Sequence, residues 1–282
     1  MEIFKKIAPF RAFLKEIRTP SGQTVGLVPT MGALHKGHLE LIRAAKRHNT
    51  FAACTIYVNP TQFNNAVDLQ KYPRTLEDDV KMLEKVGCDV VFCPENSEMY
   101  AEKSQLKFDF GTLDKVMEGK FRPGHFSGVA LVVSKFFNIV APDNAYFGQK
   151  DWQQFAIIRQ MVEELKFNVT LHSIETLREP DGLAMSSRNL RLTAEQRTKA
   201  TIFYQALLSA KQRLKDGNDI SAVAKEVRDS VALINGVSLE YFEVADSKNL
   251  NVLDFVKDAE NPIMCIAGYV GEVRLIDNMF LD

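Results

Sequence analysis

The sequence predicts an α/β fold in which a mostly parallel sheet is followed by a smaller unit of helices and antiparallel strands. Between residues 25 and 174, short apolar runs alternate with segments of helical periodicity, which is the pattern of βαβ units. After Glu179–Gly182 the pattern changes to two long helical segments and then closely spaced strand-like runs. We therefore expect a domain boundary near residue 178, which divides the chain into residues 1–178 and 179–282.

The first unit is expected to begin with a short helix, because Pro9 stands in the first turn of an apolar spacing that continues to Ile17. Strands and helices then alternate. The short apolar runs predict strands at Val25–Val28, Phe51–Val58, Val90–Cys93, Asn144–Phe147 and Val169–Ile174. Apolar residues at helical spacing predict helices over Leu39–Ala45, Leu76–Val86, Val129–Val140 and Phe155–Leu165.

The second unit is expected to open with a long helix that Thr193 caps and that runs to about Lys215. The polar turn Asp216–Asp219 separates it from a second helix, which continues through Ile234. Three strand-like runs then follow closely enough to form an antiparallel sheet, with a turn at Gly271. These runs are Leu239–Val244, Ile263–Val270 and Glu272–Ile276.

Composition bounds the class of protein. A chain of 282 residues suits two domains, and its net charge of −1 argues against a nucleic-acid partner, since such surfaces are usually basic. The four cysteines form no CxxC pair and no framework, which favours reduced core thiols and a cytoplasmic location. The N-terminal segment has no signal-peptide core, and no run approaches the ~18 apolar residues of a membrane span. We therefore expect no membrane partner.

The segment Pro29–His38 (PTMGALHKGH) holds the strongest functional signal. It joins a predicted strand to a predicted helix and places His35 and His38 at the helix N-terminus. Unpaired backbone N–H groups there favour phosphate, and imidazoles can donate hydrogen bonds to phosphate or protonate a leaving group. A His-x-x-His pair alone is more often surface decoration or a chance metal pair, and no third ligand recurs at a zinc-like spacing. Its position at the first βα turn, where open α/β sheets bind ligands, favours an ATP site.

Four other segments carry residues suited to chemistry, and the first of them points toward the same crevice as His35 and His38. Asn59 and Gln62 follow the second strand, and Lys150 and Asp151 follow the Asn144–Phe147 strand. Lys150 can neutralise phosphate charge, although a routine capped helix start is an equally good reading of that segment. The loop Met185–Arg188 offers two hydroxyls and a guanidinium that can wrap a polyphosphate, but a Ser-rich loop is usually only a linker. The Arg122–His125 segment fits either a substrate-side loop or a subunit contact.

Taken together and in order, these segments resemble the pantothenate synthetase (pantoate–β-alanine ligase) family over essentially the full chain. The matching segments are PTMGALHKGH, YVNPTQF, YPRTLEDD, RPGHFSGV, GQKDWQQ, REPDGLAMSSRN and RLIDN. The resemblance implies a Rossmann-like ATP-binding domain with a smaller C-terminal lid domain. It also implies a two-step reaction, in which ATP and pantoate form pantoyl adenylate and pyrophosphate, and β-alanine then displaces AMP to give pantothenate.

The resemblance also implies site residues. His38, His35, Lys150 and Arg188 would act in catalysis, with His38 as a proton donor, and Gln62, Gln154 and Asn59 would hold pantoate and β-alanine. The ATP site would comprise Met31, Gly32, Ala33, Leu34, His35, Lys36, Gly37, His38, Gly148, Gln149, Lys150, Asp151, Leu177, Met185, Ser186, Ser187 and Arg188. Asp78 and Asp79 are candidates near Mg²⁺. The family further implies ATP as a substrate with Mg²⁺, no permanently bound cofactor, and a homodimer.

Two rival functions remain to be distinguished. A relative of the aminoacyl-tRNA synthetases would need a tRNA-binding domain and a basic surface, and the residues after 178 supply too little of either. A non-catalytic nucleotide-binding regulator would not need His38, Lys150 and Arg188 together. Pantoate-dependent pyrophosphate exchange, with and without β-alanine, separates all three functions.

Overall fold

The computed structural model describes residues 1–19, 21–64, 66–102 and 104–282, and within them it confirms a parallel sheet followed by an antiparallel one. The six-stranded sheet has the order β1-β4-β3-β2-β5-β6, and all its neighbouring pairs are parallel. Its strands are β1 (Glu2–Phe4), β2 (Val25–Thr30), β3 (Phe51–Ile56), β4 (Val90–Phe92), β5 (Asn144–Gly148) and β6 (Thr170–Ile174). The sequence analysis did not predict β1, a short edge strand.

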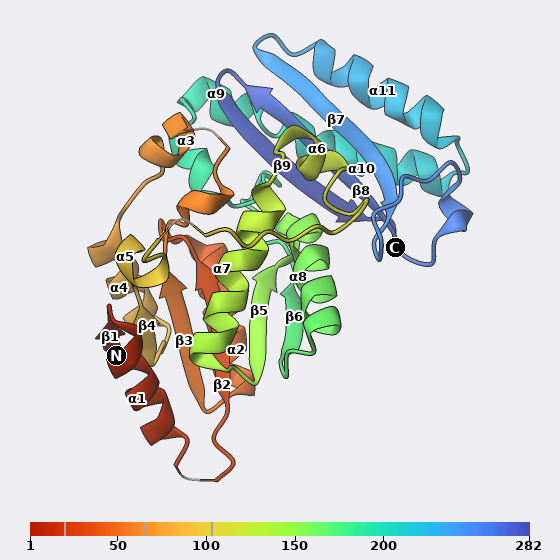
Figure 1. Ribbon diagram of the computed structural model, residues 1–282. Helices are drawn as coiled ribbons and strands as arrows, with labels where there is room; N and C mark the ends of the chain where they lie inside the picture. The colour runs from red at the N-terminus through yellow and green to blue at the C-terminus, as the bar shows by residue number, and fades with distance from the viewer. Residues whose placement is uncertain (20, 65, 103) are drawn as a thin grey trace.

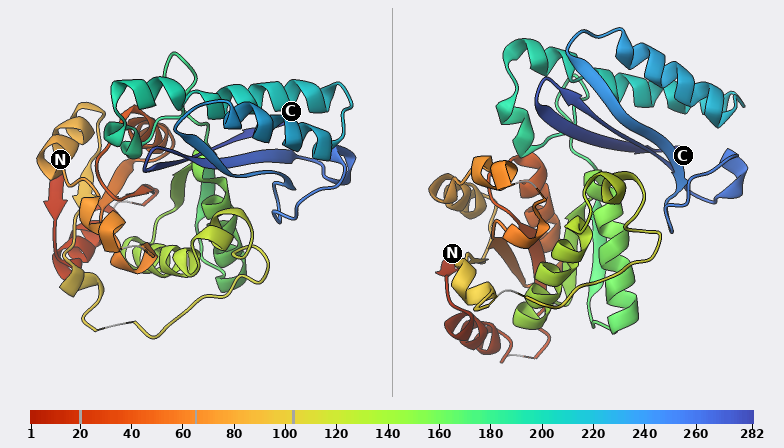
Figure 2. Two further views of the ribbon diagram at one scale, coloured as in Figure 1. Left: turned by 90° about the horizontal axis from the view of Figure 1, so that it is seen from above. Right: turned by 45° about the horizontal axis from the view of Figure 1, so that its top comes forward.

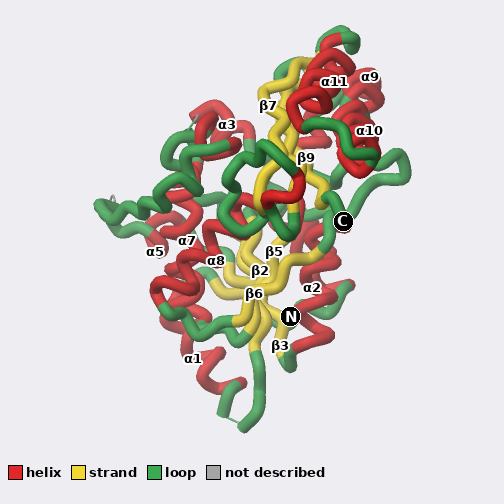
Figure 3. Tube along the Cα trace, turned by 90° about the vertical axis from the view of Figure 1, so that its right-hand side faces the viewer, coloured by secondary structure: helices red, strands yellow, loops and turns green. Residues whose placement is uncertain are grey.

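Helices cover both faces of this sheet, as Figure 3 shows with the sheet between them. One face packs on α1 (Ile7–Ile17), α7 (His125–Val140) and α8 (Trp152–Leu165), and the other on α2 (Lys36–His48) and α4 (Leu76–Lys85). Strands β2 and β3 are buried on both sides, which explains why they are nearly continuous apolar runs. Short helices occupy the connections: α3 (Ala66–Lys71), α5 (Asn96–Met99) and α6 (Met117–Phe121).

The strand order reverses between β2 and β5, so the chain leaves these two neighbours toward opposite sides of the sheet. Open α/β sheets bind ligands in the crevice at such a switch point, outside the carboxyl ends of the strands. The loops after β2 and β5 are the ones that begin at Met31 and Gln149. The topology therefore brings two of the predicted motifs together.

The remainder of the chain forms a three-stranded antiparallel sheet, β7-β8-β9, backed by helices. It lies across the carboxyl end of the parallel sheet (Figures 1 and 2). Its elements are α9 (Ala194–Lys199), α10 (Ile202–Lys215), α11 (Ile220–Ala232), β7 (Val237–Asp246), β8 (Pro262–Val270) and β9 (Val273–Phe280). Gly271 makes the predicted turn between β8 and β9 at φ +57°.

The single helix predicted from Thr193 to Lys215 is wrong, because the structure divides it into α9 and α10. Thr193 is the expected N-cap and accepts a hydrogen bond from the Gln196 backbone. At the break, the Thr201 hydroxyl donates to the Thr198 carbonyl at 2.8 Å, and the Thr201 amide contacts the same carbonyl at 3.4 Å. Threonine side chains compete for backbone partners in this way, and here the competition interrupts the helix.

Strand β8 joins the two hydrophobic cores. Ile263 and Cys265 belong to the core formed by α7, α8 and the parallel sheet, whereas Met264 and Ile266 belong to the core under α10 and α11. Alternate residues of a strand point to opposite faces, so one strand supplies both cores. The antiparallel sheet is therefore packed into the first unit, and the two units do not meet through polar surfaces alone.

Candidate active site

A pocket opens at the switch point, between the carboxyl ends of β2 and β5 and the segment that follows β6. Among the residues expected at the ATP and acid sites, those that line it are Met31, His35, Gly37, His38, Gln62, Gly148, Lys150, Asp151, Gln154, Leu177, Met185, Ser186, Ser187 and Arg188. Gly32, Ala33, Leu34, Lys36, Asn59 and Gln149 do not line it; some of them hold the lining residues in place, as described below. The structure thus collects groups from five separated segments around one cavity.

Asp79 organises the loop that follows β2. Gly32 and Ala33 take positive φ values of 82° and 50°, and this turn directs the amides of Ala33 and Leu34 toward one point. The buried Asp79 carboxylate accepts both hydrogen bonds, at 2.9 and 2.8 Å, and a third from the Thr75 hydroxyl. Successive amides in such a turn form an anion-binding concavity, which Asp79 fills from within the protein.

The same geometry bears on the two candidates for the Mg²⁺ site, Asp78 and Asp79. Asp79 is fully buried and its oxygens are used by the loop, while Asp78 is exposed and pairs with Lys81 at 3.4 Å. Neither residue lines the pocket. Within the described ranges, no group of three or more His, Cys, Asp or Glu side chains is arranged to hold a metal ion.

The two histidines at the start of α2 hold each other in defined orientations. The His35 amide donates to Nδ1 of His38 at 3.3 Å, and the Gly37 amide donates to Nδ1 of His35 at 3.2 Å. A Cβ atom at Gly37 would lie 3.0 Å from the His35 ring, so glycine permits this close packing. Because each Nδ1 accepts a hydrogen bond, the proton of each neutral ring lies on Nε2. Both imidazoles therefore have an Nε2–H available to a ligand.

Both histidines are neutral at physiological pH. Burial, followed by the nearby positive charge of Lys150, lowers the pKa of His35 to about 4. Burial and the neighbouring His35 hold the pKa of His38 well below its ordinary value. A neutral imidazole at a helix N-terminus can donate a hydrogen bond to a developing negative charge without first being protonated.

Gln62 is held by three neighbouring contacts in a loop pressed against α7. Asn59 Nδ2 donates to Gln62 Oε1 at 3.1 Å and also to the Gly128 carbonyl at 3.1 Å. The Gln62 amide group contacts Met31 Sδ at 3.0 Å, and His125 Nδ1 lies 2.7 Å from the Gln62 carbonyl. Asn59 thus acts on the pocket through Gln62, with Asn59 and Gln62 both buried.

The loop after β5 is supported from the second unit. The Asn278 side-chain amide, on β9, donates to the carbonyls of Gln149 and Lys150 at 2.9 and 2.7 Å. The Lys150 ammonium lies in the pocket, 3.7 Å from Asp151. Gln149 therefore contributes its backbone carbonyl to this support while its neighbour Lys150 reaches the ligand space.

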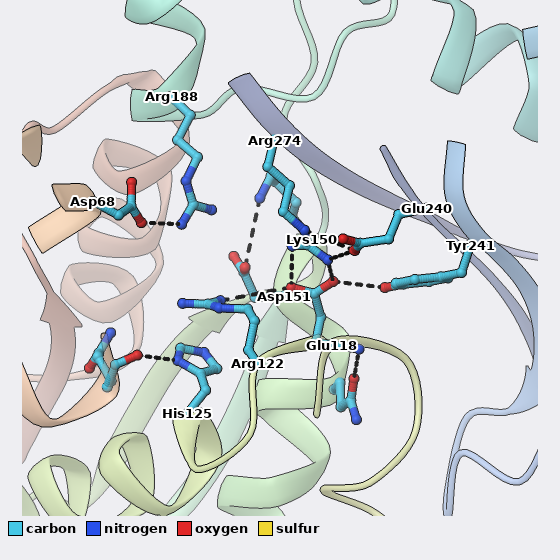
Figure 4. A network of polar contacts seen from close by, with 12 residues as sticks. Asp68, Glu118, Arg122, His125, Lys150, Asp151, Arg188, Glu240, Tyr241 and Arg274 are labelled. Carbon is cyan, nitrogen blue, oxygen red and sulfur yellow. Dashed lines mark hydrogen bonds and ion pairs between the residues drawn. The ribbon is translucent and has the colours of Figure 1, made fainter. Parts of the chain in front are cut away.

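On the opposite wall, Ser186 accepts a hydrogen bond from the Arg188 amide at 3.3 Å. The Arg188 guanidinium lies 3.6 Å from Asp68 of α3 (Figure 4). The same Asp68 carboxylate also pairs with Arg191, at 3.1 Å. Arg188 is thus tied to a carboxylate of the first unit.

Arg122 and His125, in the segment whose role the sequence left open, both line the pocket. The His125 ring is buried, and this burial, with the charge of Arg122, lowers its pKa to about 3. Tyr72 also lines the pocket, and its hydroxyl lies 3.4 Å from Ser187 Oγ. Tyr72 lies in the motif YPRTLEDD, and Arg122 and His125 lie in RPGHFSGV. No periodicity in the sequence marked these three residues as part of the pocket.

Beside the pocket, a buried ion cluster joins the two units (Figure 4). Glu118 of α6 accepts hydrogen bonds from both terminal nitrogens of Arg274 on β9, each at 2.7 Å, and one from the Tyr241 hydroxyl at 3.0 Å. Arg274 also bonds to Glu240, and Arg122 lies 3.8 Å from Glu118. The sequence analysis missed Glu118 and Arg274, because they are 156 positions apart and belong to no local pattern.

Comparison with known proteins identifies relatives over the whole chain. The family described as Pantoate-beta-alanine ligase matches residues 2–280. Curated proteins called pantothenate synthetase are similar: that of Porphyromonas gingivalis is 46% identical over 279 residues (99% of each chain), and that of Bacteroides fragilis is 44% identical (99% of this chain and 98% of the other).

Solved structures agree with these relatives. Pantothenate synthetase from Thermus thermophilus has a TM-score of 0.92 and 37% identity, with 100% of this chain and 99% of that chain covered. Pantoate-beta-alanine ligase from Francisella tularensis, complexed with beta-gamma ATP and beta-alanine, has a TM-score of 0.83 and 34% identity, with coverages of 100% and 98%.

Proposed function

The chain belongs to the pantoate–β-alanine ligase family, and from this premise we propose which of its residues carry the ATP-dependent condensation of pantoate with β-alanine. The reaction needs activation because a free carboxylate has no good leaving group. In the first step, a pantoate carboxylate oxygen bonds to the α-phosphorus of ATP, and the bond to the β-phosphate oxygen breaks. In the second, the β-alanine amine attacks the acyl carbon and AMP leaves.

The observation that carries the assignment is the set of hydrogen-bond donors around one pocket. Negative charge builds on the pyrophosphate oxygens as the first bond breaks. The neutral Nε2–H groups of His35 and His38 lie on one side, and Lys150, Ser186, Ser187 and Arg188 supply further donors. Fixed donors stabilise such charge without reorganising during the reaction. We assign His38 the role of hydrogen-bond donor, since its lowered pKa leaves it uncharged before ATP binds.

Pantoate is assigned to the side of the pocket that Gln62 and Gln154 line. Both amides can donate to a carboxylate and accept from a hydroxyl, which suits a small hydroxy acid. Asn59 fixes Gln62 Oε1, and Gln62 Nε2 donates one N–H toward Met31 Sδ, so the second N–H of Nε2 is the group offered to the acid. The wall of Arg122 and His125 faces the same space.

We assign Mg²⁺ to the substrate, as MgATP. The carboxylates of Asp78 and Asp79 lie outside the pocket lining, and the described residues form no metal-binding group of their own. Phosphate oxygens and water are sufficient ligands for Mg²⁺, which retains several waters and binds proteins through few carboxylates. The residues Met185–Arg188, which follow the proposed boundary at 178, would then close over the triphosphate.

Location and assembly are further proposals. We infer a cytoplasmic enzyme that acts without nucleic acid and forms a homodimer through the first unit. The four cysteines are unpaired and buried, which supports a reducing compartment. Among the described helices, none combines the length and the apolar character that crossing a membrane requires. Analytical ultracentrifugation tests the homodimer, and a purely monomeric species at micromolar concentration would contradict it.

The decisive experiment is isotope exchange between pyrophosphate and ATP. We expect exchange that depends on pantoate and does not require β-alanine, followed by release of AMP and pantothenate when β-alanine is added. Exchange that depends on an amino acid and tRNA would indicate the synthetase alternative. Nucleotide binding with no exchange would indicate a regulator.

A further inference from the structure

A second cavity of about 390 Å³ lies beside the pocket, between α3 and the β8–β9 hairpin. Arg122 and Arg188 line both this side cavity and the main pocket. Their guanidinium groups therefore form a shared wall, and a phosphate leaving the main pocket on this side would meet them first. Figure 4 shows both side chains directed into the space between the two units.

The described lining of the side cavity is rich in positive charge. Beyond Arg122 and Arg188 it includes Lys71, Arg191 and Arg274, whereas its acidic residues are Asp68, Glu240 and Glu272. Two of the carboxylates that pair with these cations are each shared between two arginines, and Glu240 pairs with Arg274. Asp68 serves both Arg188 at 3.6 Å and Arg191 at 3.1 Å, and Glu118 serves both Arg274 and Arg122.

Lys71, which shares α3 with Asp68, lines the cavity and forms no ion pair with the described part of the chain. The pKa of Arg122 is lowered to about 10 by burial and by the charge of Arg188. The positive charges of the two guanidinium groups repel each other, and an anion between them would relieve this repulsion. The cavity is thus organised to attract a multivalent anion from the main pocket.

We propose that the side cavity is the exit path of pyrophosphate, with Arg191 and Lys71 forming a transient site for it outside the ATP pocket. This inference rests on the proposed function, because adenylation supplies the ligand. When the bond between the α-phosphorus and the bridging oxygen breaks, its electron pair leaves on pyrophosphate, while pantoyl adenylate stays in the main pocket. Departure past Arg122 and Arg188 leaves that intermediate covered, and it limits access of water to the reactive acyl group.

The test separates adenylate formation from pyrophosphate release. In the double variant Arg191→Gln/Lys71→Gln, neither altered residue lines the main pocket, so rapid-quench measurement should give adenylate formation within about twofold of wild type. Stopped-flow detection of released pyrophosphate should be slower by about tenfold, at the low end of the effect of charged clefts on ionic ligands. The exposed pair Arg213–Glu226 provides a control, since Arg213→Gln removes a cation that does not line the cavity.

Asp68→Asn provides a test of opposite sign. It removes a negative charge between Arg188 and Arg191, so added pyrophosphate should inhibit this variant more strongly than it inhibits the wild type. Added pyrophosphate should inhibit the double variant more weakly than it inhibits the wild type. Unchanged release in the double variant would overturn the exit path, and so would a parallel loss of adenylate formation and release. Absence of pantoate-dependent adenylation in the wild-type enzyme would instead overturn the proposed function.

Discussion

The backbone amide of His35 donates a hydrogen bond to Nδ1 of His38, 3.3 Å away, at the first turn of α2. This contact leaves the His38 proton on Nε2, where it can meet a ligand. The loop that precedes this turn is fixed by Asp79, which accepts hydrogen bonds from the amides of Ala33 and Leu34. The orientation of the histidines is therefore set by backbone contacts before any substrate binds.

Replacement of His38 by alanine should reduce pantoate-dependent pyrophosphate exchange by ~10²–10³, the usual cost of losing one donor to transition-state charge. His38→Gln should keep more activity, because its amide nitrogen can occupy the position of Nε2. Circular dichroism and the melting temperature serve as controls for folding. Exchange near the wild-type rate in His38→Ala would mean that His38 only caps the helix.

Gln62→Ala should weaken pantoate binding by roughly 1–3 kcal/mol, the cost of leaving a buried polar partner unpaired, and should change ATP binding far less. Asn59→Ala should shift the two affinities in the same direction and by a smaller amount, because Asn59 acts by fixing Gln62 Oε1. Titration calorimetry with each substrate separately measures both effects. Equal losses for ATP and pantoate would assign Gln62 a role in supporting the loop.

Glu118→Gln should lower the free energy of unfolding by about 3 kcal/mol, because it removes a buried negative charge that faces both Arg274 and Arg122 and leaves Glu240 as the one carboxylate on Arg274. Glu118 and Arg274 are almost fully enclosed, with side-chain exposures of 9% and 15%. The exposed pair Arg213–Glu226 offers the comparison: Arg213→Gln should cost less than about 1 kcal/mol. Urea unfolding measures both, and similar values for the two variants would contradict the importance of burial here.

Acid should destabilise the protein through its buried histidines. An unfolded histidine titrates near 6.5, whereas burial lowers the pKa of His125 to about 3, so between these values the unfolded chain binds the additional proton. The contribution of His125 to the free energy of unfolding is therefore fully present above pH 6.5 and decreases as the pH falls. At pH 5 the loss from this one group is about 2 kcal/mol.

His125→Asn tests this linkage, because its amide can still donate to the Gln62 carbonyl but does not titrate. Urea unfolding at pH 7.5 and pH 5 should show a smaller loss in the variant than in the wild type. His35, with a pKa lowered to about 4, continues to contribute in both. An identical loss in the two proteins would show that His125 is not one of the groups responsible.

The sequence predicted those parts of the pocket that lie in loops directly after a strand. PTMGALHKGH and GQKDWQQ each follow an apolar strand, and parallel strands bring such loops to one edge of the sheet. The same reasoning did not define the contacts of Asp79, because a carboxylate in an acidic helical segment is compatible with both a metal ligand and an internal anion. Only the positive φ of Ala33, and the direction of its amide, distinguishes the two.

Contacts between distant segments could not be predicted in this way. The pairing of Glu118 with Arg274 depends on how β9 lies over α6, and no periodicity in either segment encodes that placement. At the division of α9 from α10, the Thr201 hydroxyl bonds to the Thr198 carbonyl, a local contact that the apolar periodicity does not encode. The first feature therefore follows from tertiary context and the second from local side-chain bonding.

Strand β8 places Ile263 and Cys265 in one core and Met264 and Ile266 in the other, so neither core is complete without it. Heat should therefore melt the chain as one cooperative unit, although its secondary structure divides into two. Scanning calorimetry should show a single transition whose van't Hoff and calorimetric enthalpies agree. Motion of one unit against the other during turnover must bend the connections around β8, because separating its two faces would expose both cores to water.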